Sequence, residues 1–211
     1  MMGRSFNIGD AIRYGWEIVK NNIAFFIIML LIVYGLSITI SFVARHVGML
    51  GIIVTLAGLV VQFLMAIGMV KIVLGFIDNR KPALGELFDG LPLVINYFIA
   101  NIIFVVVCAM GFICLIVPGI YLMCRLIFWQ FFVVDRNLGP VEALQASWEA
   151  TRGIALNVFL FGMVLWLLNL VGLICLGVGL LVTIPISMVA VAYVYRTLLA
   201  QMAQDGSLES A

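Results

Sequence analysis

The sequence predicts an all-α integral membrane protein in which six transmembrane helices form three tandem hairpin repeats, each preceded by a cytoplasmic amphipathic interfacial helix. Three observations predict this fold: the composition, six long apolar runs, and a short phrase that occurs three times. Of the 211 residues, 65% are hydrophobic and only 10% are charged, whereas a typical soluble domain has about 25% charged residues. A soluble fold of this length cannot bury so much apolar surface, so we expect most of that surface to face lipid.

The six apolar runs are the predicted spans, because crossing a bilayer takes about 20 mainly apolar residues. The second run is long enough to tilt, and the fourth is short. A preceding stretch, 6–22, is amphipathic and lacks the pattern of a cleavable signal peptide, so we expect it to be retained. From the N-terminus the predicted spans are 23–43, 49–77, 93–116, 120–134, 157–176 and 178–199.

The charged residues predict the orientation of these spans. Every acidic residue and almost every basic residue falls at or near one membrane face, while Arg45 and His46 lie in a loop on the other side. Lys and Arg beside spans mark the cytoplasmic side. Both termini are therefore predicted to be cytoplasmic, and the short outer connections leave no room for an external domain.

A short phrase opens each pair of spans and predicts internal duplication. Its copies read AIRYGWE at 11–17, ALGELFD at 83–89 and ALQASWE at 143–149. A second match, GFICL at 111–115 and GLICL at 172–176, has nearly the same offset as the last two phrases. The chain is thus expected to be a single membrane domain, 1–211, built from repeats at about 6–78, 82–136 and 140–204. A pseudo-threefold arrangement and tandem packing without symmetry both remain open.

Each phrase has the pattern of a short amphipathic helix at the cytoplasmic interface. Its aliphatic and aromatic residues are four positions apart and would share one helical face. Trp16, Phe88 and Trp148 are the predicted interfacial anchors, because aromatic rings favour headgroup depth. Pro140 fits the start of the third of these amphipathic helices, because proline is favoured in the first turn of a helix. Two roles remain open: the helices only float at the interface, or they close into a collar that binds a partner or gates a path.

A series of motifs, densest in the second half of the chain, resembles a known family. The motifs are VPGIYL at 117–122, Arg125, VDRNLGP at 134–140, EAL at 142–144, SW at 147–148, TRG at 151–153 and AYVYR at 192–196. Together they resemble the YciC-like proteins and the glycerophosphodiesterase membrane domain, which are multispanning bacterial inner-membrane proteins. The resemblance implies a bacterial inner-membrane location. It implies no phosphodiesterase activity, because catalysis in those enzymes belongs to a separate soluble barrel domain.

Arg125 is the first candidate for a binding site. It lies near the middle of the fourth predicted span, where an arginine raises the free energy of insertion by about 2.5–3.5 kcal/mol. No acidic residue lies inside any predicted span to neutralise it. Either its side chain extends to a headgroup or to water, or it binds an anion or a lipid.

Lys71 and Arg196 are further candidates for lipid or anion binding, near the ends of the second and sixth spans. Extension of both side chains to cytoplasmic headgroups explains their positions. With Arg125 they would alternatively line a basic inner vestibule suited to anionic lipid headgroups.

The sequence favours neither catalysis nor a cofactor. His46 is the single histidine, the four cysteines lack CxxC spacing, and no catalytic motif is present. Pro118 and Pro185 are expected to kink or break helices. We expect a non-enzymatic envelope accessory or scaffold whose partners are membrane lipids, anionic ones included, or a membrane protein such as a second copy of the chain, and not nucleic acid. The alternative is a small carrier or channel for an anionic or lipid-like substrate with Arg125 in its path.

Overall fold

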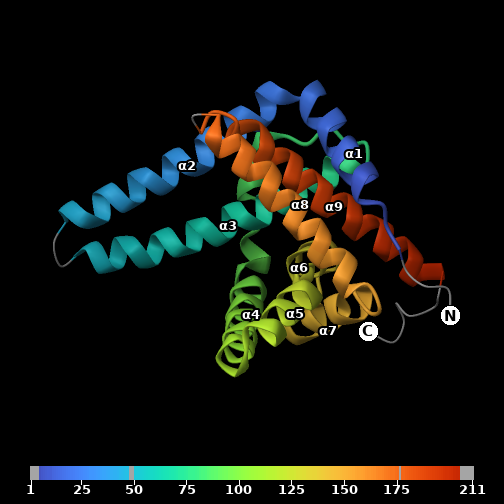
Figure 1. Ribbon diagram of the computed structural model, residues 1–211. Coiled ribbons are helices and arrows are strands. Elements are labelled where there is room, and N and C mark those ends of the chain that lie inside the picture. Colours follow the sequence, from blue (N-terminus) through green and yellow to red (C-terminus); the bar gives the residue numbers. More distant parts are fainter. Residues whose placement is uncertain (1–4, 48–49, 176, 205–211) are drawn as a thin grey trace.

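The structure is a computed structural model that describes residues 5–47, 50–175 and 177–204. Over these residues it contains helices and no strand (Figure 1). Six segments are long and apolar enough to cross a membrane, namely Ile23–His46, Gly51–Ile77, Leu84–Cys114, Ile116–Arg136, Ala155–Ile174 and Leu180–Gln204. The predicted all-α, multi-pass architecture is confirmed, and the predicted spans overlap these segments one for one.

Three helical hairpins make up most of the molecule. They are α2 (Ile23–His46) with α3 (Gly51–Ile77), α4 (Val94–Cys114) with α5 (Ile116–Leu126), and α8 (Ala155–Ile174) with α9 (Leu180–Gln204). In Figure 1 the α2–α3 hairpin projects to the left and the α4–α5 hairpin projects downwards from a shared region. The turns of these two hairpins therefore lie far from each other.

Glycines let the two helices of a hairpin approach closely near the turn. A Cβ atom on Gly111 would lie 3.0 Å from the Cα atom of Gly119, and one on Gly179 would lie 2.6 Å from the carbonyl oxygen of Gly172. In the first hairpin Gly51 sits against the carbonyl oxygen of Ala44. Small residues serve the same purpose at helix contacts in lipid.

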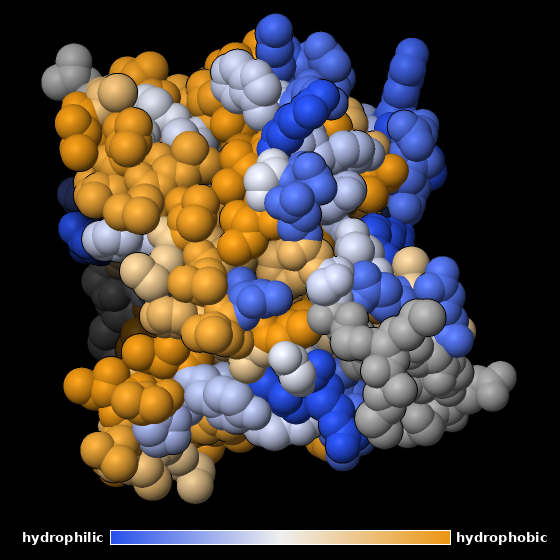
Figure 2. All heavy atoms as spheres, turned by 45° about the vertical axis from the view of Figure 1, so that its right-hand side comes forward, coloured by the Kyte–Doolittle hydropathy of each residue, from blue (hydrophilic) through white to orange (hydrophobic). Residues whose placement is uncertain are grey.

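The buried core lies at the opposite ends of the hairpins, which we call the hub. Buried side chains concentrate in the second half of α3 and in the first two turns of α2 and α8, and they occur along most of α9, from Thr183 to Met202. At the turns, by contrast, Ile113 is 84% exposed and Ile174 is 73% exposed. Figure 2 shows a broad hydrophobic surface on one side and hydrophilic atoms gathered on the other. The exposed apolar surface is the part of the molecule suited to contact lipid tails.

The fourth span is not the single helix that we predicted over 120–134. It consists of α5, which ends at Leu126, and α6 (Trp129–Arg136), with a break at Ile127 and Phe128. Pro118 does not kink it, because it lies in the first turn of α5, where proline is tolerated. In the sixth span, α9 continues through Pro185 without a break.

Only two of the three repeated phrases form α-helices. α1 (Ile8–Asn21) and α7 (Pro140–Ala150) contain the first and third, and Pro140 starts α7 as expected. The second phrase forms the 3₁₀ helix η2 (Leu84–Phe88), so the interfacial α-helix predicted there was wrong. The short η3 (Leu91–Leu93) follows. η2 packs closely on α3, since a Cβ atom on Gly68 of α3 would clash with the backbone of Leu87 in η2.

Helix α1 packs antiparallel along α9. At its start Ser5 exchanges hydrogen bonds with Gln201, at 2.7 and 3.2 Å, and further along a Cβ atom on Gly15 would lie 2.8 Å from the carbonyl oxygen of Ile186. Trp16 remains exposed beside this contact. The N-terminal segment is therefore part of the hub, with Trp16 on its free face.

Candidate functional site

Arg125 lies next to the break between α5 and α6, one residue before α5 ends. Its residue surface is 5% exposed. The guanidinium carbon is 3.9 Å from the ring centroid of Trp148 on α7 and 5.7 Å from that of Tyr121 on α5. This is cation–π geometry. Arg125 is thus held against α7 and does not lie in the middle of a continuous helix.

Two hydroxyl groups, one from α7 and one from the residue that caps its C-terminus, satisfy the backbone at the break. Ser147 Oγ and Thr151 Oγ1 donate to the carbonyl oxygen of Arg125, at 3.1 and 2.9 Å. Ser147 Oγ also accepts a hydrogen bond from the N–H of Phe128, at 3.2 Å. Helix ends leave such groups without partners inside the helix. In the sequence Ser147 and Thr151 belong to the motifs of the family resemblance and carry no other signal, although a spacing of four residues places two side chains on one face of a helix.

The charge of Arg125 has no acidic partner within the described part of the chain. None of the ion pairs between described residues includes it, and its Nε atom is buried without a hydrogen-bond partner there. The ring of Trp148 compensates part of the desolvation, since a desolvated cation–π contact contributes about 2 kcal/mol. An unpaired buried cation nevertheless favours binding of an anion.

An apolar groove of about 400 Å³ lies beside Arg125, between α5 and α8. Its lining includes Val117 and Ile120 from α5 and Leu156 and Phe159 from α8. Tyr121 belongs both to this groove and to the aromatic surroundings of Arg125. The groove therefore adjoins the buried cation.

Arg196 on α9 is the centre of an ion-pair network at the hub. It binds Asp135 through Nη1–Oδ2 and Nη2–Oδ1, at 2.8 and 2.9 Å, and its Nη2 also donates to Asp78 Oδ2 at 2.7 Å. The hydroxyl of Tyr195 donates to Asp135 at 2.9 Å. A bidentate arginine–carboxylate pair is among the stronger polar contacts in proteins. Arg196 thus connects the third hairpin to the ends of the second and fourth spans.

Lys71 and Arg196 line one charged pocket of about 540 Å³ at the hub. Lys71 Nζ donates to the carbonyl oxygen of Asp89 at 2.7 Å. Arg125 is not among the residues of this pocket, so the three cations do not form the basic vestibule considered above. The charged residues of its lining are Lys71, Arg80 and Arg196 together with Asp78, Glu86, Asp89 and Asp135.

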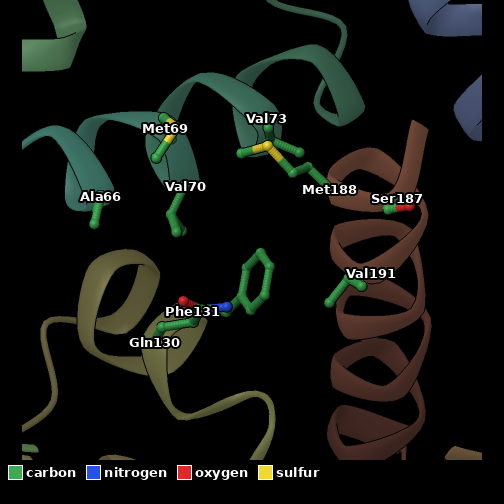
Figure 3. Close-up of a pocket in the computed structure, with 9 residues that line it drawn as sticks. All are labelled: Ala66, Met69, Val70, Val73, Gln130, Phe131, Ser187, Met188 and Val191. Carbon is green, nitrogen blue, oxygen red and sulfur yellow. The ribbon is translucent and has the colours of Figure 1, made fainter. Parts of the chain in front are cut away.

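An apolar cavity of about 240 Å³ lies between α3, α6 and α9. Figure 3 shows side chains of all three helices pointing into a common space, with Met69 on α3, Phe131 on α6 and Met188 on α9. Gln130 and Ser187 are the polar residues of its lining, and both have hydrogen-bond partners elsewhere, namely Tyr97 and Asn169. The cavity therefore offers mainly apolar surface.

The predicted anchors differ in their surroundings. Trp16 and Phe88 are exposed, whereas Trp148 is half-buried against Arg125. The described residues contain no group of three His, Cys, Asp or Glu side chains placed to hold a metal ion.

Residues 42–204 match a family described as a domain of unknown function (DUF7847). The chain belongs to this family. The DUF7847 region begins within α2 and ends with α9, so it contains Arg125, α7 and the Arg196 network but not α1. Comparison with curated proteins and with solved structures found no match. The resemblance to the YciC-like and glycerophosphodiesterase membrane-domain proteins stays a prediction.

Proposed function

We propose that this DUF7847 protein is a non-enzymatic, multispanning protein of the bacterial inner membrane that acts through lipid contacts as an envelope accessory or scaffold. The observation that carries the proposal is Arg125, a buried cation without a described acidic partner, beside an apolar groove. An anionic phospholipid meets both features, since its headgroup supplies the missing negative charge and an acyl chain fills the groove.

Both termini are cytoplasmic in this proposal, which places the hub on the cytoplasmic side. The concentration of charged residues at the hub supports that orientation. A membrane-protein partner, including a second copy of the chain, is the other class of contact that an accessory protein would make. The exposed Trp16 and Phe88 are proposed to lie at headgroup depth.

We also propose that the three hairpins derive from one duplicated unit. Two structural correspondences support it. The glycine contacts near the turns join Gly111 to Gly119 and Gly172 to Gly179. In addition, the second and fourth spans each end near an aspartate and an asparagine with positive φ, namely Asp78 with Asn79 (56°) directly after it, and Asp135 with Asn137 (58°) two residues after it.

A small carrier for an anionic or lipid-like substrate is the alternative function. It is favoured by the charged pocket and the apolar cavity, which follow each other along the same three helices. A path through them would have to open the contact between Phe131 and Tyr195, whose ring centroids are 5.1 Å apart. Arg125 lines neither space, which favours the accessory role.

Lipid analysis of the purified protein tests the proposal. The protein and its Arg125→Leu variant are extracted in mild detergent, and bound phospholipids are identified by native mass spectrometry. We expect the unchanged protein to retain an anionic phospholipid that R125L loses. Arg152→Leu is the matched control, because Arg152 is an exposed arginine just after α7 that pairs with Glu149 at 3.5 Å.

A second variant separates lipid binding from folding. Arg125→Lys keeps the positive charge, so it should retain more of the anionic lipid than R125L does. A folded R125L protein that keeps the same lipid would contradict the proposal. Substrate movement in liposomes that depends on Arg125 would instead establish the carrier.

A further inference from the structure

We infer that the apolar cavity between α3, α6 and α9 and the charged pocket beside it form a second lipid site, which takes a phospholipid with a zwitterionic headgroup. This site is separate from Arg125, which lines neither space. The inference goes beyond the proposed function because it assigns a different lipid class to a different set of helices.

The apolar cavity has the properties of an acyl-chain site. Its volume of about 240 Å³ is below the roughly 300–1,000 Å³ typical of sites for drug-sized molecules, so it suits one chain segment. Met69 on α3 and Met188 on α9 both line the cavity, and in Figure 3 the Met188 side chain extends towards Val73 on α3. Methionine side chains are flexible and polarizable and adapt to an irregular apolar ligand.

The charged pocket follows the apolar cavity directly along the same three helices. On α3 the neighbours Val73 and Leu74 line the cavity and the pocket, respectively. On α9 the step is from Val191 to Arg196, a rise of about 7.5 Å for five helical residues. A glycerophospholipid joins its headgroup to its chains over a comparably short connection, so one molecule can occupy both spaces.

Tyr195 joins the walls of the two spaces. Its ring stacks on Phe131, which lines the apolar cavity, with ring centroids 5.1 Å apart. Its hydroxyl donates to Asp135, which lines the charged pocket. The boundary between chain and headgroup would therefore lie at the depth of this side chain.

The charges of the pocket select the headgroup class. Asp78 and Asp135 already neutralise Arg196. Lys71 and Arg80 remain as cations and Glu86 and Asp89 as anions, so the pocket presents both signs. Lys71 uses one of its three donors on the Asp89 carbonyl, which leaves two for a phosphate group.

A zwitterionic headgroup complements this arrangement. Its phosphate faces Lys71 and Arg80, and its ammonium faces the Asp89 carboxylate. An anionic headgroup has no ammonium, so it leaves the acidic side of the pocket without a partner and adds like-charge repulsion. We therefore assign phosphatidylethanolamine, and not phosphatidylglycerol, as the matching chemistry.

Lipid titration of the full chain tests the assignment. Delipidated protein in detergent is titrated with dioleoyl phosphatidylethanolamine and with dioleoyl phosphatidylglycerol, and each bound lipid is counted by native mass spectrometry. Ala66→Phe places a ring at the wall of the apolar cavity. Ala57→Phe is the matched control, because Ala57 is an exposed residue on the same helix.

We expect A66F to bind phosphatidylethanolamine about tenfold more weakly than A57F and the unchanged protein, corresponding to ~1.4 kcal/mol. Lys71→Gln should also weaken it, whereas Lys20→Gln on the exposed end of α1 should not. Equal binding of phosphatidylethanolamine by A66F and A57F would overturn the site. The headgroup assignment would be overturned if phosphatidylglycerol bound as tightly as phosphatidylethanolamine, or more tightly, and if A66F weakened that binding.

The R125L variant keeps the two lipid hypotheses distinguishable. It should retain phosphatidylethanolamine at the α3–α6–α9 site even if it loses an anionic lipid. Loss of both lipids from R125L, with the fold intact, would contradict the separation of the two sites.

Discussion

Arg196 binds Asp135 through two hydrogen bonds of 2.8 and 2.9 Å, although the two residues belong to the sixth and fourth spans. The same guanidinium reaches Asp78 at the end of α3. A single side chain from the last span thus joins the ends of two earlier spans. Because the hairpins diverge beyond the hub (Figure 1), polar contacts here have a larger part in fixing their relative positions than they would in a closely packed bundle.

Replacing Arg196 should destabilise the hub. Removing one partner of a fully buried ion pair raises the folded-state free energy by about 3–5 kcal/mol, but Arg196 is 25% exposed, so we expect about 1–3 kcal/mol for Arg196→Met. Arg196→Lys should recover part of the loss because it keeps the charge without the bidentate geometry. Thermal unfolding in detergent measures both, with Arg13→Met in the exposed Arg13–Glu17 pair as the control. Equal melting temperatures for R196M and R13M would contradict the prediction.

The hydroxyl groups at the helix break should contribute more to the stability of the protein than hydroxyls that bond only within their own helix. Ser147→Ala and Thr151→Val each remove a buried donor to the Arg125 carbonyl. Each should lower the free energy of unfolding by about 1–3 kcal/mol, and the double variant should deviate from additivity because both bond the same oxygen. Ser37→Ala is the control, since the Ser37 hydroxyl donates to the Val33 carbonyl one turn earlier in the same helix. A Ser37→Ala effect as large as that of Ser147→Ala would refute this role.

The sequence predicted the spans well because their signal is local. A run of about 20 apolar residues identifies a spanning helix without knowledge of its neighbours. The break at Ile127 and Phe128 has no such signal, since neither proline nor glycine marks it. The break depends on hydroxyl groups about 20 residues later in the chain. These groups reach the break only because α7 packs against it in the folded protein.

The candidate site was predicted only in part for the same reason. The sequence identified Arg125, Lys71 and Arg196 as unusual charges near spans. It did not indicate that Arg196 meets Asp78 and Asp135, because pairing between residues so far apart in the chain follows from the arrangement of the hairpins. Arg125 does lie near the middle of the fourth span, Ile116–Arg136, as predicted, but the helix break beside it and its contact with Trp148 were not predicted.

Replacing a glycine at the contact between α4 and α5 by a residue with a large side chain should destabilise the protein. Gly111→Leu would force the helices apart, because a Cβ atom there would lie 2.6 Å from Leu122 Cδ1 and 3.0 Å from the Gly119 Cα atom. We expect a loss of about 1–3 kcal/mol, typical of overpacking. Gly162→Leu on α8 is the control, since a Cβ atom there would meet no atom within 4 Å. Higher helix propensity should leave G162L as stable as the unchanged protein or more so. Similar destabilisation by both variants would argue against a specific contact.

The proposed orientation predicts different labelling of the two sides of the membrane. In a background with the four cysteines replaced, Arg45→Cys should react with a membrane-impermeant maleimide added to intact spheroplasts. Asp10→Cys on α1 should react only after the membrane is permeabilised, because α1 belongs to the hub. The reverse pattern would place the hub outside and would contradict cytoplasmic termini.

Trp148 should be required for holding Arg125 at the break. Its ring lies 3.9 Å from the guanidinium carbon, and a desolvated contact of this kind contributes about 2 kcal/mol. Trp148→Leu should therefore destabilise the protein by an amount of that order and reduce retention of anionic lipid, since the cation loses its fixed position. Trp166→Leu is the matched control, because Trp166 is exposed on α8.

A double-variant cycle separates the cation–π contact from simple packing. In the Arg125→Leu background, Trp148→Leu should have a clearly smaller effect on unfolding than in the unchanged protein, because the partner cation is already absent. If the two effects are equal, Trp148 contributes apolar packing alone. The position of Arg125 would then have to depend on the helix break and on the hydroxyls of Ser147 and Thr151.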